Sequence, residues 1–232
     1  SLKQYKNNGA EIDEIEIVKV DSISDEEIIK NDVKTFNFGD EQLFRFKIYE
    51  TSDETVLFSD FHHIITDGVS QINIFTDIAN AYENRDLSQE IVDGYVYSLI
   101  EKDAKNSDKY AKSKEFFDEK LSQEIESTVL TPNLNGNPDE GEIKTIIQDI
   151  NPENIKEFCN YYSLSQNALF LSAITLALNK FTFSDKTLIT TIFNGRSNPY
   201  YYDTQGFLVK TLPLIFNNEN RQSTIKEFIN ES

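Results

Sequence analysis

The stretch from residue 56 to residue 82 constrains the fold more than any other part of this 232-residue chain. An apolar and aromatic run that ends at Phe61 is typical of a β-strand, and the two histidines of the sequence, His62 and His63, follow it directly. Neighbouring residues of a strand point to opposite faces, so one imidazole can face a cleft while the other packs behind it. An Asp-Gly turn comes next, and then a helical apolar pattern over residues 70–82.

The adjacent histidines are the candidate groups for proton transfer. Histidine takes and gives protons near neutrality because its unperturbed pKa is about 6.5. Asp67 or Ser70 can cap the helix that follows, and Gly68 tolerates a backbone shape or a close approach that a Cβ atom would prevent. A histidine pair at a strand end can also be structural or a stray metal ligand, so the pair alone does not establish a function.

The full pattern His-His-x-x-x-Asp-Gly at residues 62–68 resembles the core motif of the condensation domains of nonribosomal peptide synthetases. More broadly it resembles the chloramphenicol-acetyltransferase-like superfamily, whose shared form is His-x-x-x-Asp-Gly. Three further stretches resemble the condensation domains in order and approximate spacing. They are residues 38–45, the Phe-Asn-Gly-Arg of residues 193–196, and the Gly-Phe-Leu-Val-Lys-Thr-Leu-Pro-Leu of residues 206–214.

The resemblance implies an α/β fold, a chloramphenicol-acetyltransferase-like two-lobe α/β sandwich. Against the family pattern the chain lacks an opening stretch and a long closing segment, so we expect a fold truncated at both ends; a naturally short relative is the alternative. We expect a portion of the N-terminal lobe with the histidine motif over residues 1–125 and a portion of the C-terminal lobe over residues 142–232. The intervening residues 126–141, which contain proline and glycine among polar residues, are expected to be a linker.

The resemblance also implies roles for single residues. In the family, an acceptor amine attacks a donor thioester in a cleft between the lobes, and an amide forms. His63 would face this channel as a general base or as a group that positions the amine. The catalytic motif continues with Asp67, which is expected to turn away and pair with Arg196, and with Gly68, which is expected to line the channel. His62 and Arg196 would support the site structurally, His62 by holding the loop with hydrogen bonds.

Three functions remain open. The first is amide formation between carrier-bound thioesters, which the double histidine and residues 206–214 favour. The second is another acyltransferase, acting on free acyl-coenzyme A and a small alcohol or amine, or an epimerase of the same superfamily. The third is a non-catalytic docking module with the same fold. Lys210 stands where the family usually has asparagine, which puts the donor side of the site in doubt.

Charge and composition exclude several classes. The chain has 40 acidic and 22 basic residues, for a formal net charge of -18, which argues against binding to nucleic acid or to an anionic membrane. No stretch is long and apolar enough to span a bilayer and no secretory signal opens the sequence, so a cytoplasmic setting is expected. Cys159 is the only cysteine, which excludes an internal disulfide framework and a cysteine-based metal site.

The expected partners follow from the resemblance. Donor and acceptor peptidyl carrier proteins would bring the substrates on phosphopantetheine, next to an adenylation domain, and this domain would bind no cofactor and no metal itself. Four lysines at helical spacing could receive an acidic carrier, although a solvated helix face is the ordinary alternative. They are Lys102, Lys105, Lys109 and Lys112.

Apolar periodicity predicts the elements. Strands are expected over residues 14–20, 43–49, 56–61, 143–150, 188–193 and 207–216, with the second and third forming an antiparallel hairpin. Helices are expected over residues 70–82 (well buried), 95–125 (with one or two breaks), 152–162 and 165–181 (in the core). Residues 194–205 should form an exposed loop.

Overall fold

The computed structural model describes residues 14–39, 41–122, 128, 130 and 144–217. The chain divides into two compact units, each described here by itself. Unit 1 contains residues 1–110 and 193–210, and unit 2 contains residues 111–192 and 211–232. Apart from Thr128 and Leu130, the predicted linker at 126–141 lies outside the described residues.

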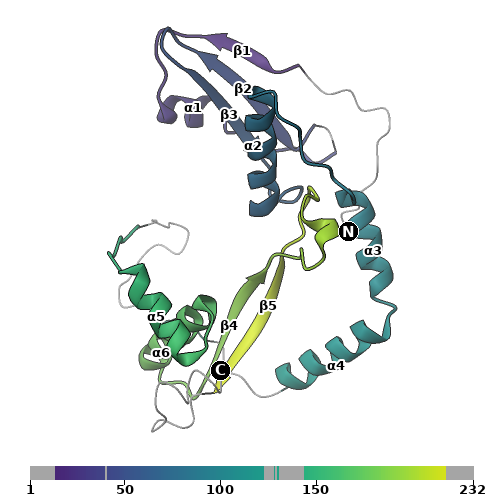
Figure 1. Ribbon diagram of the computed structural model, residues 1–232, viewed down its shortest axis with the longest axis vertical. Coiled ribbons are helices and arrows are strands. Elements are labelled where there is room, and N and C mark those ends of the chain that lie inside the picture. Colours follow the sequence, from purple (N-terminus) through teal and green to yellow (C-terminus); the bar gives the residue numbers. More distant parts are fainter. Residues whose placement is uncertain (1–13, 40, 123–127, 129, 131–143, 218–232) are drawn as a thin grey trace. The chain divides into compact units, whose positions relative to one another are not determined.

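A three-stranded sheet forms the frame of unit 1 (Figure 1). It consists of β1 (Glu16–Lys19), β2 (Phe44–Glu50) and β3 (Thr55–Phe61), in that order. β1 runs parallel to β2, and β2 and β3 form the predicted antiparallel hairpin. The Thr51 N–H donates to the Glu54 carbonyl at 2.9 Å and closes the turn between them. The hairpin brings the end of β3, where the histidines follow, back to the start of β2.

Helix α1 (Asp25–Asp32) was not predicted from the sequence, although its start carries a recognisable signal. Ser24 and Glu27 form a capping box, in which each side chain accepts a hydrogen bond from the backbone N–H of the other residue. A serine followed three residues later by glutamate is the usual mark of such a start.

Helix α2 (Gly68–Tyr82) follows the histidine loop as predicted, but the expectation that it is well buried is wrong. Ser70 is its only buried residue, and Ile72 and Tyr82 are 66% and 91% exposed. Among the described elements, no helix or strand packs extensively against α2, so its apolar side chains stay exposed or half-buried. Its polar contacts include one from Asn73 to the Tyr202 carbonyl at 2.9 Å.

The helical segment predicted over residues 95–125 forms two helices, α3 (Gly94–Ala104) and α4 (Asp108–Leu121), and its last three residues lie outside the described residues. The break at residues 105–107 divides the four lysines of the predicted stripe. Lys102 lies on α3, Lys105 caps it, and Lys109 and Lys112 lie on α4; all four are exposed. The lysines therefore do not form one continuous helix face.

Among the described residues, unit 2 contains most of α4, two further helices and most of a two-stranded sheet. The helices α5 (Pro152–Tyr162) and α6 (Gln166–Thr182) begin as predicted, α5 after the N-cap Asn151. The strands β4 (Lys186–Phe193) and β5 (Lys210–Asn217) pair with each other. A short 3-10 turn, η1 (Pro199–Tyr201), lies in the segment between them, which belongs to unit 1.

Two predictions for unit 2 are wrong. Residues 144–150 form no strand, and Ile146 and Ile147 are 84% and 85% exposed, because no described strand offers backbone partners to this segment. Helix α6 is not a core helix among the described residues. Only Ser172 and Thr175 of α6 are buried, and Phe181 is 75% exposed. Within the described ranges, no helix is both long enough and apolar enough to cross a bilayer.

Candidate functional site

His62 forms the centre of a tight turn at the end of β3. Its N–H donates to the Leu43 carbonyl at 2.9 Å and extends the hairpin by one step. Its carbonyl accepts from the Ile65 N–H at 3.1 Å, and its Nδ1 accepts from the Ile64 N–H at 3.1 Å. Both the backbone and the side chain of His62 therefore fix the conformation of the loop.

Two phenylalanines hold the His62 ring. The Phe36 and Phe38 rings meet it edge-on, with centroid distances of 5.9 and 4.8 Å. Both residues come from the segment that precedes β2. His62 is therefore the histidine that packs behind the loop.

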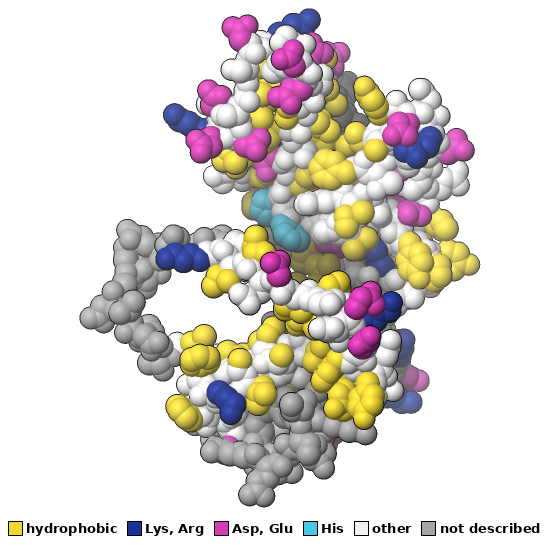
Figure 2. Space-filling view, turned by 60° about the vertical axis from the view of Figure 1, so that its left-hand side comes forward, with side chains coloured by type: hydrophobic (Ala, Val, Ile, Leu, Met, Phe, Trp, Pro, Cys, Tyr) yellow, Lys and Arg dark blue, Asp and Glu magenta, His cyan; other side chains and the backbone are white. Residues whose placement is uncertain are grey.

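His63, in contrast, is exposed. Its ring meets the Phe207 ring edge-on at a centroid distance of 5.5 Å. In Figure 2 the imidazoles, coloured cyan, reach the surface of the molecule. The next residue, Ile64, and Phe207 both line a cavity of about 320 Å³ in unit 1, together with residues of α3 such as Tyr97. The imidazole of His63 is thus accessible to a molecule that approaches from solvent.

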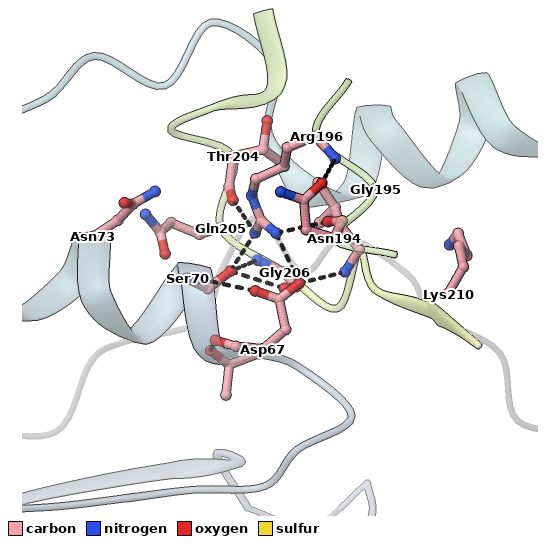
Figure 3. A network of polar contacts seen from close by, with 12 residues as sticks. Asp67, Ser70, Asn73, Asn194, Gly195, Arg196, Thr204, Gln205, Gly206 and Lys210 are labelled. Carbon is pink, nitrogen blue, oxygen red and sulfur yellow. Dashed lines mark hydrogen bonds and ion pairs between the residues drawn. The ribbon is translucent and has the colours of Figure 1, made fainter. Parts of the chain in front are cut away.

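Asp67 is fully buried and uses both carboxylate oxygens inside the protein (Figure 3). Oδ1 accepts from the Ser70 N–H at 2.9 Å, so Asp67 is the N-cap of α2. Oδ2 accepts from the Leu208 N–H and from Nη1 of Arg196, each at 2.9 Å. The strand predicted from residue 207 starts only at Lys210. The reason is that the backbone N–H of Leu208 donates to Asp67 and not to a neighbouring strand.

Arg196 connects α2 to the segment that joins β4 and β5. Its Nη2 donates to Ser70 Oγ at 2.8 Å and to the Thr204 carbonyl at 2.9 Å. Ser70 Oγ in turn donates to the Gly206 carbonyl and accepts from the Gly206 N–H. Arg196 and Thr204 are buried, so the expectation that residues 194–205 form an exposed loop is wrong at these positions. The contacts of the buried Arg196 side chain therefore keep residues 196 and 204 away from solvent.

The electrostatics of Asp67 favour its charged form. Burial by itself would raise the pKa of the Asp67 carboxyl, but the hydrogen bonds from Arg196 and from the backbone of Ser70 and Leu208 hold this pKa below its ordinary value. Both carboxylate oxygens accept hydrogen bonds from inside the protein and the side chain has no exposure to solvent, so Asp67 stabilises the loop and does not face a bound molecule.

The glycines near the site have different physical roles. Gly195 has a φ of 74°, and a Cβ atom there would lie 2.2 Å from the Leu208 carbonyl oxygen, so only glycine fits. At Gly68 a Cβ atom would meet nothing within 4 Å, and φ is not in the left-handed region. The backbone conformation and the protein neighbours of this residue therefore do not require glycine, and its expected place along the channel stays a prediction. Gly68 instead borders an open groove of about 640 Å³ along α2.

Lys210, the departure from the family pattern, is paired. Its Nζ lies 2.6 Å from Glu101 Oε1 on α3 and 5.7 Å from the centre of the Tyr97 ring. Tyr97 is buried, and its hydroxyl donates to the Gly195 carbonyl at 3.4 Å. Burial, followed by the negative charge of Glu101, raises the pKa of Tyr97 to about 12.

The sequence predicts Asp67, Arg196 and both histidines as site residues, but not several of the residues that contact them. Ser70 was considered only as a helix cap, and nothing in the sequence singled out Thr204 or the N–H of Leu208. The structure brings Asp67 and Arg196 together, whereas His63 makes no polar contact with them that the structure records. No group of three or more acidic, histidine or cysteine side chains within the described ranges is arranged to hold a metal ion.

The chain is similar in sequence to a known protein family. The family model described as "Condensation domain" matches residues 2–232. Bacitracin synthase 3 of Bacillus licheniformis is 26% identical over 228 residues, which are 94% of this chain and 4% of the synthase. Surfactin synthase subunit 1 of Bacillus subtilis (strain 168) is 24% identical over 200 residues, 82% of this chain and 6% of that subunit.

Solved structures show the same fold. The condensation domain from the monacolin K polyketide synthase MokA matches with a TM-score of 0.74 and 17% identity, over 93% of this chain and 52% of that chain. The epimerization domain from the third module of tyrocidine synthetase B matches with a TM-score of 0.75 and 15% identity, over 93% and 53%. These matches confirm the predicted chloramphenicol-acetyltransferase-like α/β fold. The chain spans about half the length of these solved chains and a small fraction of the curated relatives.

Proposed function

This chain belongs to the condensation-domain family, and on that premise we propose that it takes part in amide (peptide) bond formation between two carrier-bound thioesters. The donor is an acyl or peptidyl thioester, and the acceptor is the amine of an aminoacyl thioester. Both substrates arrive on the phosphopantetheine arms of peptidyl carrier proteins, next to an adenylation domain of the same assembly line. The domain binds no cofactor of its own in this proposal.

The proposed reaction is an acyl transfer. The acceptor nitrogen attacks the donor carbonyl carbon, a C–N bond forms, the C–S bond breaks, and the proton lost by the amine balances the proton gained by the departing thiolate. His63 serves either as the base that takes this proton or as the group that orients the amine. Each role is sufficient in principle, since general base catalysis typically contributes about 10²–10⁴-fold and orientation can contribute as much.

One observation supports this role above the others. His63 is exposed, while the loop that carries it is fixed on both sides. On one side, His62 closes the turn through Ile64 and Ile65. On the other side, the buried pair of Asp67 and Arg196 anchors the start of α2. An accessible reactive group on a rigid support is what a positioned catalytic group requires.

The remaining residues of the motif act indirectly in this proposal. Asp67, Arg196 and His62 keep the loop in shape and do not touch the substrates. Gly68 leaves open space at the start of α2, where a pantetheine arm can pass. In this proposal, the missing side chain of Gly68 leaves room for the substrate and is not needed for the backbone conformation.

The activity is tested with the natural protein that contains this chain, supplied with a loaded donor carrier and a loaded acceptor carrier. We expect the donor carrier to lose its acyl group and the acceptor carrier to gain it as an amide, as measured by intact-protein mass spectrometry. An acceptor carrier without its pantetheine arm is the control and should gain nothing.

The same experiment separates the alternatives. Inversion of the carrier-bound residue without transfer would indicate an epimerase, and transfer from acyl-coenzyme A to a free amine would indicate another acyltransferase. Binding of both carriers without any reaction would indicate a docking module. Each of these three outcomes contradicts the proposal.

A further inference from the structure

We propose that Arg45 is a positioning residue for the loop that carries His63, and that it acts through Phe36 and His62. Nothing in the histidine motif points to this residue, because Arg45 lies on β2 and precedes the motif by a full hairpin. The consequence for catalysis rests on the function proposed above, whereas the effect on His62 does not.

The guanidinium of Arg45 forms hydrogen bonds with the backbone of the segment that precedes β2. Its Nη1 donates to the Lys34 carbonyl at 2.8 Å, and its Nη2 to the Thr35 carbonyl at 3.3 Å. Nη1 also donates to Asp60 Oδ2 at 2.8 Å, which fixes the guanidinium against β3. A planar group with several donors in a fixed fork can make these contacts at once, which a lysine cannot do.

The same guanidinium lies over the ring of Phe36, with Cζ 3.7 Å from the ring centre. At this distance the cation is attracted to the face of the ring, and the contact gains strength because Arg45 is only 24% exposed. The backbone bonds to residues 34 and 35 and the contact with the ring therefore hold Phe36 in one place.

Phe36 in turn limits the orientation of His62. Its ring meets the imidazole edge-on, and Phe38 meets it from a second position. The χ2 torsion of histidine has broad minima, so a ring of this kind is oriented by its neighbours. In the observed orientation Nδ1 accepts the Ile64 N–H, which requires the proton of a neutral His62 to be on Nε2.

The orientation of His62 affects His63 through the backbone. If the His62 ring turns, the bond to the Ile64 N–H is lost, and the tight turn that follows β3 loses one of its two closing bonds. His63 lies inside this turn. A displacement of about 1 Å at a reacting group can reduce a rate by about 10²-fold. Arg45 therefore stabilises the position of a group that it does not touch.

Lys47 provides a matched control on the same strand. It lies two residues after Arg45, so its side chain is on the same face of the sheet. The two side chains are 22% and 24% exposed, and each pairs with an aspartate, Lys47 with Asp32 and Arg45 with Asp60. The ring beside Lys47 is that of Tyr49, however, and not one that reaches His62.

The test is ¹⁵N nuclear magnetic resonance of the imidazole nitrogens, which is favourable because the chain has only two histidines. In the wild type at a pH where the rings are neutral, we expect His62 to give the signals of a single tautomer with the proton on Nε2. In Arg45→Met these signals should move toward the average of the two tautomers. In Lys47→Met they should stay in place.

A second variant covers the case in which Arg45→Met does not fold. Phe36→Leu keeps the polar contacts of Arg45 and removes only the ring, and it should shift the His62 signals in the same direction. Unchanged His62 signals in the folded variants, or an equal shift in Lys47→Met, would overturn the inference.

The catalytic part is measured in the natural protein that contains this chain. Arg45→Met should lower kcat by about 10–100-fold with little change in KM, while Lys47→Met should lower neither by as much. An undiminished kcat in Arg45→Met would overturn the catalytic part of the inference. If the wild type forms no amide while the His62 signals shift as expected, the proposed function fails and the positioning of His62 by Arg45 stands.

Discussion

Nη1 of Arg196 lies 2.9 Å from Oδ2 of Asp67, although 129 positions separate the two residues in the chain. The two side chains are 2% and 0% exposed, so the ion pair is removed from water. A buried pair adds little stability compared with an apolar pair of the same shape, but the loss of one partner leaves an uncompensated charge. The pair therefore makes the shape of the histidine loop dependent on the segment between β4 and β5.

The first prediction concerns the stability of this pair. Asp67→Ala should lower the free energy of unfolding by about 3–5 kcal/mol, because Arg196 would remain buried without its counter-ion and α2 would lose its N-cap. Urea denaturation followed by circular dichroism measures this difference. The comparison is Glu83→Ala, which breaks a pair whose side chains are 57% and 58% exposed. The loss there should be at most about 1 kcal/mol. Equal losses in the two variants would contradict the account.

The second prediction concerns pH. The hydrogen bonds from Arg196, Ser70 and Leu208 lower the pKa of Asp67 in spite of its burial. A carboxyl whose pKa is lower in the folded state stabilises the fold fully above its unfolded pKa of about 3.9, and this stabilisation is lost as the pH falls through the folded value. The stability difference between the wild type and Asp67→Asn should therefore be constant between about pH 7 and pH 5 and shrink below about pH 4. Denaturation at a series of pH values tests this, and a difference that grows on acidification would refute it.

The third prediction compares two glycines. Gly68→Ala should leave the free energy of unfolding within about 0.5 kcal/mol of the wild type, because the added Cβ atom meets nothing within 4 Å. Gly195→Ala should destabilise by more than about 1 kcal/mol, because φ is 74° and the Leu208 carbonyl oxygen occupies the position of the Cβ atom. Thermal unfolding of the two variants provides the measurement. A large loss of stability in Gly68→Ala would show instead that the backbone conformation at this position requires glycine.

The fourth prediction follows if a pantetheine arm passes Gly68. Gly68→Leu should then stop acyl transfer in the natural protein while the melting temperature stays close to that of the wild type. Asn80→Leu is a suitable comparison, since Asn80 borders the same groove further along α2. Transfer assays with both loaded carriers measure the effect, and full activity in Gly68→Leu would exclude the passage of the arm at this point.

The local elements of the fold were largely predictable from the sequence. The β2–β3 hairpin follows from clean alternation, and the helices α5 and α6 follow from their apolar patterns, because these signals depend only on neighbouring residues. The strand expected over residues 143–150 failed at its described positions. A strand also needs a partner, and a single apolar run carries no information about one.

The site was predictable only in part for a related reason. The motif itself pointed to His63, Asp67 and Gly68, and the family resemblance pointed to Arg196. The contacts that make the site rigid join residues far apart in the sequence, such as Ser70 with Gly206 and Arg196 with the Thr204 carbonyl. The burial of α2 was overestimated because apolar periodicity indicates which face can be buried but not whether another element covers it.

The most direct measurement is the rate of amide formation by the natural protein that contains this chain after the change His63→Ala, with donor and acceptor carriers loaded beforehand. We expect a rate at least about 100-fold lower than that of the wild type, with both carriers still loaded, because the group that acts on the amine is lost. The melting temperature should stay unchanged, because the exposed His63 ring contacts only Phe207 among the recorded ring contacts. A rate equal to that of the wild type would contradict the assignment of His63 as the group that acts on the substrates.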